Sequence, residues 1–374
     1  MRTTMATPAG IFPPGGLDTQ EQWHQAGQPG PGATTDMQDT RVKRHVHTGT
    51  GTTCALHRRI LQLPSLVTTL AITLLCTAAA QAQSTSIAVG PRPESITQGW
   101  GGRYYVSIQG PSGAAGVNDG EIRQVEPDSG VVTPFVDGLE NPRGLAFTGT
   151  YLVCADGPRI WIIDASGNVD LLAEAAQFPF PAAFFNDVAP AHNERAVYVS
   201  EMGNLALMRD AAGVMQPAEV GLSIPAASRI YRISIPNGQI SEAMAPTRQA
   251  LIINGVKEAR HGKGQRLLVL DMFYGSIVRH EMHTDQSHIL ATGFRGLDSL
   301  EEGADGTLYV SSFDGGAVYK LDADGTNPVT LISGVGYKTT ADMALDEENG
   351  RLLVPDTAHG TVIILPTAGG TPLP

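Results

Sequence analysis

The chain has 374 residues, of which 42% are apolar and 17% charged, and its formal net charge at pH 7 is −12. This apolar content is enough for a packed core and excludes wholesale disorder. The acidic balance argues against a nucleic-acid-binding surface, which needs a basic stripe. With 43 glycines and only 6% aromatic residues, the composition favours many short strands joined by turns over a helical bundle.

The first 82 residues are expected to be a leader. Residues 1–56 are rich in Gly, Pro, Thr and Gln without an apolar period, which predicts a disordered or over-annotated extension. Residues 57–82 have the pattern of a secretory signal peptide: a basic start at Arg58 and Arg59, an apolar run over 66–80, and small residues at Ala80 and Ala82. The run is shorter than the roughly 20 residues of a membrane span, although an uncleaved anchor is the alternative. We therefore expect a secreted or periplasmic protein, residues 83–374, with no stable membrane insertion after cleavage.

A sequence unit recurs six times in the rest of the chain. Each unit has a polar residue, a small or apolar pair, a turn with glycine, an apolar strand, a loop and a second strand. The opening polar residues, here called the marker residues, are Glu94, Arg143, Asn186, Asn254, Asp298 and Asp342, at spacings of 49, 43, 68, 44 and 44. A period near 44 with about four short strands is typical of propeller blades. The sequence thus predicts an all-β, six-bladed β-propeller with four-stranded blades.

The ends of the chain are expected to close the ring. Residues 366–374 are too rich in Pro and Gly for a good outer strand, whereas residues 86–89 precede the first unit and can supply one. Pairing residues 86–89 with 362–365 would cover a sheet edge that otherwise invites aggregation. We therefore predict a closure strand from the N-terminal side.

The marker residues and the longest loops should share one face. In a blade of four antiparallel strands, A to D from the centre outwards, strand A begins on the face that also carries the B–C loops. The two insertions, residues 110–120 and 203–228, fall in B–C loops. Elaborated loops on a regular scaffold commonly carry function.

Four of the marker residues carry side-chain oxygens and should converge near the central channel: Glu94, Asn186, Asn254 and Asp298. Two carboxylates and two amides make a site of hard oxygen ligands, which suits Ca²⁺, and Mg²⁺ or Mn²⁺ less well. No Cys or His cluster has the spacing of a standard zinc site, although Zn²⁺ stays possible at the oxygen site. Taken singly, each Asn is as well explained as a turn residue.

The unit resembles that of the regucalcin/gluconolactonase (senescence-marker-protein) family of six-bladed propellers, which is related to paraoxonase- and diisopropylfluorophosphatase-type enzymes. The matching segments are residues 93–96 (PESI), 185–188 (FNDV), 253–256 (INGV) and 297–300 (LDSL), and the similarity covers about residues 86–366. The resemblance implies that Glu94, Asn186, Asn254 and Asp298 hold one divalent metal that polarises a carbonyl. It implies hydrolysis of lactones or related esters, with Asp298 as the catalytic residue that activates water or attacks directly.

The chain also departs from that family. In the sugar-lactone enzymes an Arg lies two residues before the first metal-binding Asn, and here that position is Phe184 in an apolar stretch. This favours an apolar small-molecule lactone or ester as substrate. Candidate substrate contacts are Phe184, Phe185, Phe313, Arg143 and Asp342, with Phe273 and Tyr337 as further pocket residues. The alternatives are that the Phe residues pack between blades and that Arg143 and Asp342 form surface ion pairs.

None of the His residues of the mature chain is a marker residue, so no paraoxonase-type His pair is assigned; His192 is expected on the opposite face and Cys154 in the core.

A non-catalytic propeller that binds a peptide, polysaccharide or protein partner is the main alternative, because the fold hosts many functions. A condensing enzyme of the strictosidine synthase type has the same form, but it would not need the oxygen site.

Overall fold

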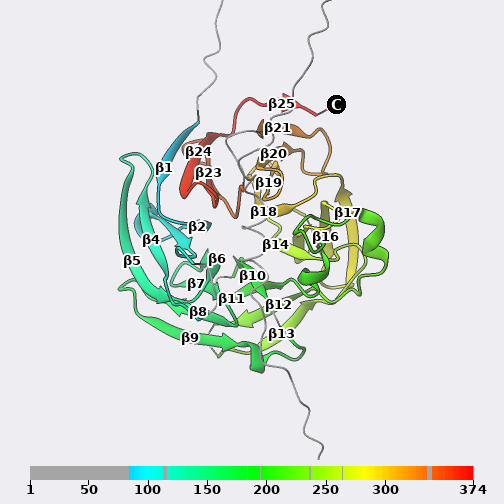
Figure 1. Cartoon of the computed structure of the whole chain (residues 1–374), viewed down its shortest axis with the longest axis horizontal. Helices are drawn as coiled ribbons and strands as arrows, with labels where there is room; N and C mark the ends of the chain where they lie inside the picture. Colours follow the sequence, from blue (N-terminus) through cyan, green and yellow to red (C-terminus); the bar gives the residue numbers. More distant parts are fainter. Residues whose placement is uncertain are drawn as a thin grey trace, which may run out of the picture. The chain divides into compact units, whose positions relative to one another are not determined.

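The computed structural model describes residues 84–373, except 113–115, 183, 194, 236, 263 and 335–338. The predicted N-terminal extension and signal peptide lie outside these residues. No helix in the described part is long and apolar enough to cross a membrane. The described residues form six antiparallel sheets arranged around a central axis, and helices are limited to short 3₁₀ turns (Figure 1). The prediction of an all-β, six-bladed propeller is confirmed.

The first three blades follow one another along the chain. Blade one consists of β2 (Pro93–Gln98), β3 (Tyr104–Ile108), β4 (Gly120–Glu126) and β5 (Val131–Leu139). Blade two consists of β6 (Pro142–Phe147), β7 (Leu152–Asp156), β8 (Arg159–Ile163) and β9 (Val169–Glu174). Blade three consists of β10 (Phe185–Pro190), β11 (Ala196–Glu201), β12 (Arg229–Ser234) and β13 (Ile240–Met244).

The last three blades complete the ring. Blade four consists of β14 (Ile253–Glu258), β15 (Arg266–Asp271), β16 (Ser276–Glu281) and β17 (Gln286–Ala291). Blade five consists of β18 (Leu297–Glu302), β19 (Leu308–Ser312), β20 (Ala317–Leu321) and β21 (Val329–Ile332). Blade six consists of β22 (Ala344–Asp346), β23 (Arg351–Asp356), β24 (Thr361–Pro366) and β1 (Thr85–Ala88).

Strand β1 closes the ring as predicted. It pairs antiparallel with β24, from Thr85 opposite Ile364 to Ala88 opposite Thr361. The pairing covers the outer edge of blade six, which would otherwise expose unpaired backbone groups. The sequence did not predict β25 (Thr371–Pro372), which adds a short fifth strand to blade five by pairing with β21.

The core lies between neighbouring blades. The second strands β3, β7, β11 and β19 are buried along their whole length, whereas the outer strands β9 and β17 are largely exposed. One apolar cluster joins Val153 and Ile160 of blade two to Val197 and Tyr231 of blade three. A strand that is covered on both faces needs apolar residues throughout, which explains why the inner strands read as continuous apolar runs.

The first strand of each of the first five blades carries an irregularity where the marker residue sits. Its register with the second strand shifts across the marker residue and the one that follows, for example between Pro93 and Ile96 and between Ile253 and Val256. Serine hydroxyls on the second strand hold three of these irregularities: Ser107, Ser200 and Ser311 accept the N–H of the residue after the marker residue at 2.9–3.0 Å. Such bulges re-aim side chains and are common beside functional sites.

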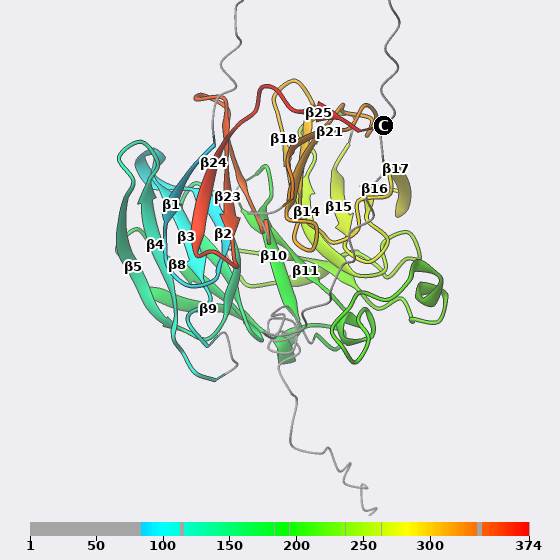
Figure 2. The same cartoon turned by 45° about the horizontal axis from the view of Figure 1, so that its top comes forward.

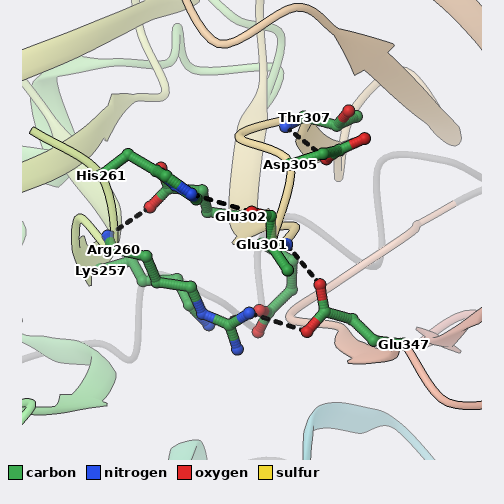
Figure 3. A network of polar contacts seen from close by, with 9 residues as sticks. Lys257, Arg260, His261, Glu301, Glu302, Asp305, Thr307 and Glu347 are labelled. Atoms are coloured by element: carbon green, nitrogen blue, oxygen red, sulfur yellow. Dashed lines mark hydrogen bonds and ion pairs between the residues drawn. The ribbon is translucent and has the colours of Figure 1, made fainter.

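The face opposite the marker residues is fastened by a polar network across blades four to six (Figure 3). His261 lies between Glu302 and Ala304 with both ring nitrogens 2.9 Å from acceptor oxygens, and Arg260 pairs with Glu347 at 2.8 Å. The hydrogen bond with Glu302 raises the pKa of His261. Because both ring partners are acceptors, the doubly protonated imidazolium is the form that satisfies both.

Candidate metal centre

The structure brings the four predicted ligand residues into one pocket. Glu94, Asn186, Asn254 and Asp298 stand on β2, β10, β14 and β18, four of the six innermost strands, which Figure 1 shows around the centre of the ring. They line a cavity of about 10 Å³ together with Phe184, Met202, Met272 and Phe313. This volume is about that of one water-sized sphere. The pocket therefore matches an ion, with four apolar side chains around it.

The amide groups of this pocket are oriented by hydrogen bonds. The Nδ2 of Asn254 donates to Oδ2 of Asp298 at 3.0 Å, and the Nδ2 of Asn186 donates to the sulfur of Met202 at 3.1 Å. Because both amide nitrogens donate hydrogen bonds, the amide oxygens are available as metal ligands. Among the described residues, Oδ1 of Asn254 and Oε2 of Glu94 are buried without any hydrogen-bond partner.

An unpartnered buried oxygen costs on the order of 1–3 kcal/mol, and more when it is charged. Two such oxygens in one pocket need a donor or a cation. Carboxylate and amide oxygens are the ligands that Ca²⁺ prefers. The residues present therefore fit a hard divalent cation.

The raised pKa values of the two carboxyl groups in the pocket also favour a divalent cation. Burial raises the pKa of Glu94 to about 7, although the nearby Arg143 and Arg92 oppose the shift. Burial, and after it the charge of Glu94, also raises the pKa of Asp298 well above its usual range. Two carboxylates that resist ionisation together would both be favoured as anions by a bound divalent cation. The described residues hold no group of three or more His, Cys, Asp or Glu side chains placed to bind a metal.

Arg143 forms part of the pocket's surroundings through an aromatic contact. Its guanidinium lies 4.0 Å from the ring centroid of Phe184, and the residue is buried. A cation over a ring face is favourable and more so when water is excluded. The contact holds Phe184 as a wall of the pocket, where the amide of the same residue also donates to Glu201 at 3.3 Å. Phe313 is the other aromatic residue that lines the pocket.

Two candidate substrate contacts lie elsewhere. Phe185 is 1% exposed and packs in the core, with ring centroids 4.5 Å from Phe178. Asp342 lines a different cavity of about 100 Å³, which also contains Asp187, Lys257 and Glu301. Phe273 is buried in the apolar cluster behind the pocket, and Tyr337 falls outside the described residues.

Hydrogen bonding explains the position of Asp342. Ser107 donates to the carbonyl of Arg143 at 2.7 Å, and the equivalent Ser311 donates to the carbonyl of Ala341 at 2.9 Å. Blade six therefore has Ala341, not Asp342, at the marker position. Asp342 is one residue further on, where the other blades have Ser95, Gly144, Asp187, Gly255 and Ser299. A shift of one residue turns a strand side chain to the other face, so Asp342 cannot face the pocket.

Sequence reasoning missed Met202 and Met272. Each follows directly after the second strand of its blade, as Phe313 does in blade five. An alignment of the residue that follows the second strand in blades three, four and five would have found them. The marker residues alone do not reveal this position. His192 lies on the opposite face, in the turn between β10 and β11, and Cys154 is buried with a pKa raised by burial.

The described residues form a six-bladed propeller with a pocket lined by side-chain oxygens of four blades. No protein-family model and no curated protein sequence matches the chain. Among solved structures, a protein provisionally described as a gluconolactonase matches with 17% identity and a TM-score of 0.55, over 79% of this chain and 95% of its own. The calcium-binding protein regucalcin from Agrobacterium tumefaciens strain C58 matches with 19% identity and a TM-score of 0.51, over 75% and 90%. The likeness extends to the fold.

Proposed function

We propose that the chain is a divalent-metal-dependent hydrolase of lactones or related esters. The observation that carries the proposal is the pair of unpartnered buried oxygens, on Glu94 and Asn254, in a pocket that Asp298 and Asn186 complete. The fold shared with a gluconolactonase-described protein and with a calcium-binding regucalcin supports both the reaction class and the cation. Calcium is the first choice of metal, because all four side chains offer oxygen.

In this proposal, Glu94, Asn186, Asn254 and Asp298 would hold the metal. When bound, the metal would act as a Lewis acid that polarises the ester carbonyl and stabilises the oxyanion. Asp298 would take the proton of the attacking water, or attack directly, and Nδ2 of Asn254 at 3.0 Å fixes the carboxylate for that role. The ring of Phe184, held by Arg143, would exclude water from the reacting carbonyl.

The substrate is proposed to be apolar. Four of the eight side chains that line the pocket are Phe or Met, and they come from blades three, four and five. Apolar walls with a few convergent polar groups are typical of small-molecule sites. We therefore expect alkyl- or aryl-substituted lactones and aryl esters to be better substrates than sugar lactones.

The test is hydrolysis by the purified protein before and after chelator treatment, and again after calcium is restored. Activity should fall at least 100-fold with chelator and return with calcium, because losing one group that stabilises the oxyanion costs roughly 10²–10³ in kcat. Asp298→Asn and Asn254→Ala should remain inactive with calcium, while Asp305→Asn on the opposite face should keep activity. Hydrolysis that is insensitive to chelator would contradict the proposal. Calcium binding without hydrolysis of any lactone or ester would favour a non-catalytic propeller that binds a partner.

Export is proposed from residues 57–82. If the signal is cleaved, the N-terminus of protein recovered from the periplasm or the medium should be Gln83. A product that keeps residues 57–82 and stays with the membrane would indicate an anchor instead.

A further inference from the structure

The B–C connection of blade three, residues 203–228, forms a strap that crosses the metal-site face. It contains two short 3₁₀ helices, Leu205–Leu207 and Ala218–Leu222. Gly221 lies so close to blade four that a Cβ there would be 2.6 Å from the ring of Phe273 and 2.4 Å from the hydroxyl of Tyr274. Arg248, which precedes blade four, donates to the carbonyls of Gly221 and Ile224 at 3.0 and 2.8 Å. The second half of the strap is thus seated on blade four.

The tip of the strap is fastened to blade five. The Nη2 of Arg209 donates to both carboxylate oxygens of Asp314, at 2.6 and 2.8 Å. Arg295, in the connection that leads into blade five, donates to the carbonyl of Gln216 at 2.5 Å. The side chain of Arg209 is only 11% exposed. A hydrogen bond between two charged groups is shorter and stronger than one between neutral groups.

Both attachments reach the wall of the metal pocket. Met202, which lines the pocket, is the residue just before the strap, and Phe313, which also lines it, is the neighbour of Asp314. These two residues and Met272 share one apolar cluster with Leu205, Met208 and Ile224 of the strap. Three of the four apolar walls therefore belong to the same apolar cluster as the strap, and the fourth, Phe184, packs against this cluster. The pocket is partly open, and its cavity of about 10 Å³ would have to widen on the side of the strap to take a long chain beside the ion.

We propose that the strap limits the length of the acyl chain that reaches the four-oxygen site, with Arg209 and Asp314 as the positioning pair. The inference rests on the proposed metal-dependent hydrolase, and it names the substrates as short-chain lactones or esters. Loss of the pair would loosen the tip of the strap beside Phe313 and admit longer chains. It would change neither the positions of the four oxygen-bearing residues nor the binding of short substrates.

The test uses carboxylates, which are products of ester and lactone hydrolysis and so probe the acid side without turnover. Calcium-loaded full-length protein is titrated calorimetrically with acetate and with decanoate. We expect Asp314→Asn to tighten decanoate binding at least tenfold and to change acetate binding less than threefold. The double substitution Arg209→Asp with Asp314→Arg should restore the wild-type ratio. Glu347→Gln, which breaks an Arg–Glu pair on the opposite face, is the matched control and should change neither.

Hydrogen exchange shows whether the strap has moved. Amides of the tip, such as those of Met208 and Gln216, should exchange faster in Asp314→Asn and recover in the charge-swapped variant. Faster exchange with an unchanged decanoate-to-acetate ratio would overturn the inference. A protein that binds calcium and acetate but hydrolyses no lactone would refute the proposed reaction. The ratio of decanoate to acetate binding would still show whether the strap limits the length of the acyl chain. A protein that takes up no calcium would overturn both.

Discussion

At the scale of single residues, the pocket is defined by buried oxygens that lack partners. Glu94 is 3% exposed and Asn254 is 2% exposed, and neither has enough donors from the described residues to satisfy it. Structures rarely leave buried polar atoms unpaired without a reason. The proposed cation would supply that reason, and it would offset the repulsion between the charges of Glu94 and Asp298.

Glu94 makes the stability of the metal-free protein depend on pH. Its pKa is about 7 in the folded protein and 4.5 in the unfolded chain, so between these values the folded state holds the extra proton. Stability of the metal-free form should therefore fall as pH rises from 4.5 to 7, because the unfolded chain gives up the proton first. Melting temperatures of the metal-free protein across this pH range test the prediction. The decrease with rising pH should be smaller in Glu94→Gln, and calcium should offset it. A metal-free melting temperature that rises over the range would contradict this assignment.

The sequence predicted that Glu94, Asn186, Asn254 and Asp298 converge, because their chemistry and spacing are periodic. The sequence misplaced Asp342 because this acidic residue stands at the interval expected for a marker residue. The hydrogen bonds of Ser107 and Ser311 show that it lies one residue after the marker position. The sequence offered Phe185 as a substrate contact because adjacent aromatic residues point to opposite faces, and composition does not say which faces inward.

At the scale of elements, the first strands are held to one another by the residue after each marker residue. Ser95 accepts the N–H of Leu145 at 3.0 Å, Asp187 that of Val256 at 2.7 Å, and Ser299 that of Met343 at 3.1 Å. Between them, Gly144 and Gly255 permit close approach, since a Cβ at Gly255 would lie 2.4 Å from the carbonyl oxygen of Asp298. This inner ring fixes the marker residues relative to one another.

Gly255→Ala should therefore destabilise the protein and disturb the site. Overpacking of a rigid backbone contact costs about 1–3 kcal/mol, and the displaced group is the backbone of the proposed catalytic residue. Urea unfolding should show the loss, and calcium affinity should fall with it. Gly303→Ala is the control, because a Cβ there meets the side chain of Asp305, which can move. Equal stability of the two variants would show that the inner ring is not tightly packed.

At the scale of the whole molecule, closure by β1 joins the first described residues to the last blade. Blade six depends on it, because β24 would otherwise be an edge strand. The period of the repeat was enough to predict six blades, and the Pro- and Gly-rich residues 366–374 together with residues 86–89 predicted this closure. The period was not enough to predict β25, because a two-residue pairing leaves no pattern in the sequence.

Removal of residues 84–88 should lower the melting temperature and cause aggregation, because the outer edge of blade six becomes free to pair with another molecule. Thermal unfolding and light scattering of the truncated and intact proteins measure this. Monodisperse truncated protein with an unchanged melting temperature would mean that β1 is dispensable.

The most direct measurement is calorimetric titration of the metal-free protein with calcium. We predict one calcium ion per chain, with affinity reduced at least tenfold by Glu94→Gln and by Asn254→Ala, each of which removes one ligand oxygen. Asp342→Asn, which alters a buried carboxylate outside the pocket, should change the affinity less than threefold. No binding, or an affinity that depends on Asp342 rather than on Glu94 and Asn254, would contradict the proposed metal centre.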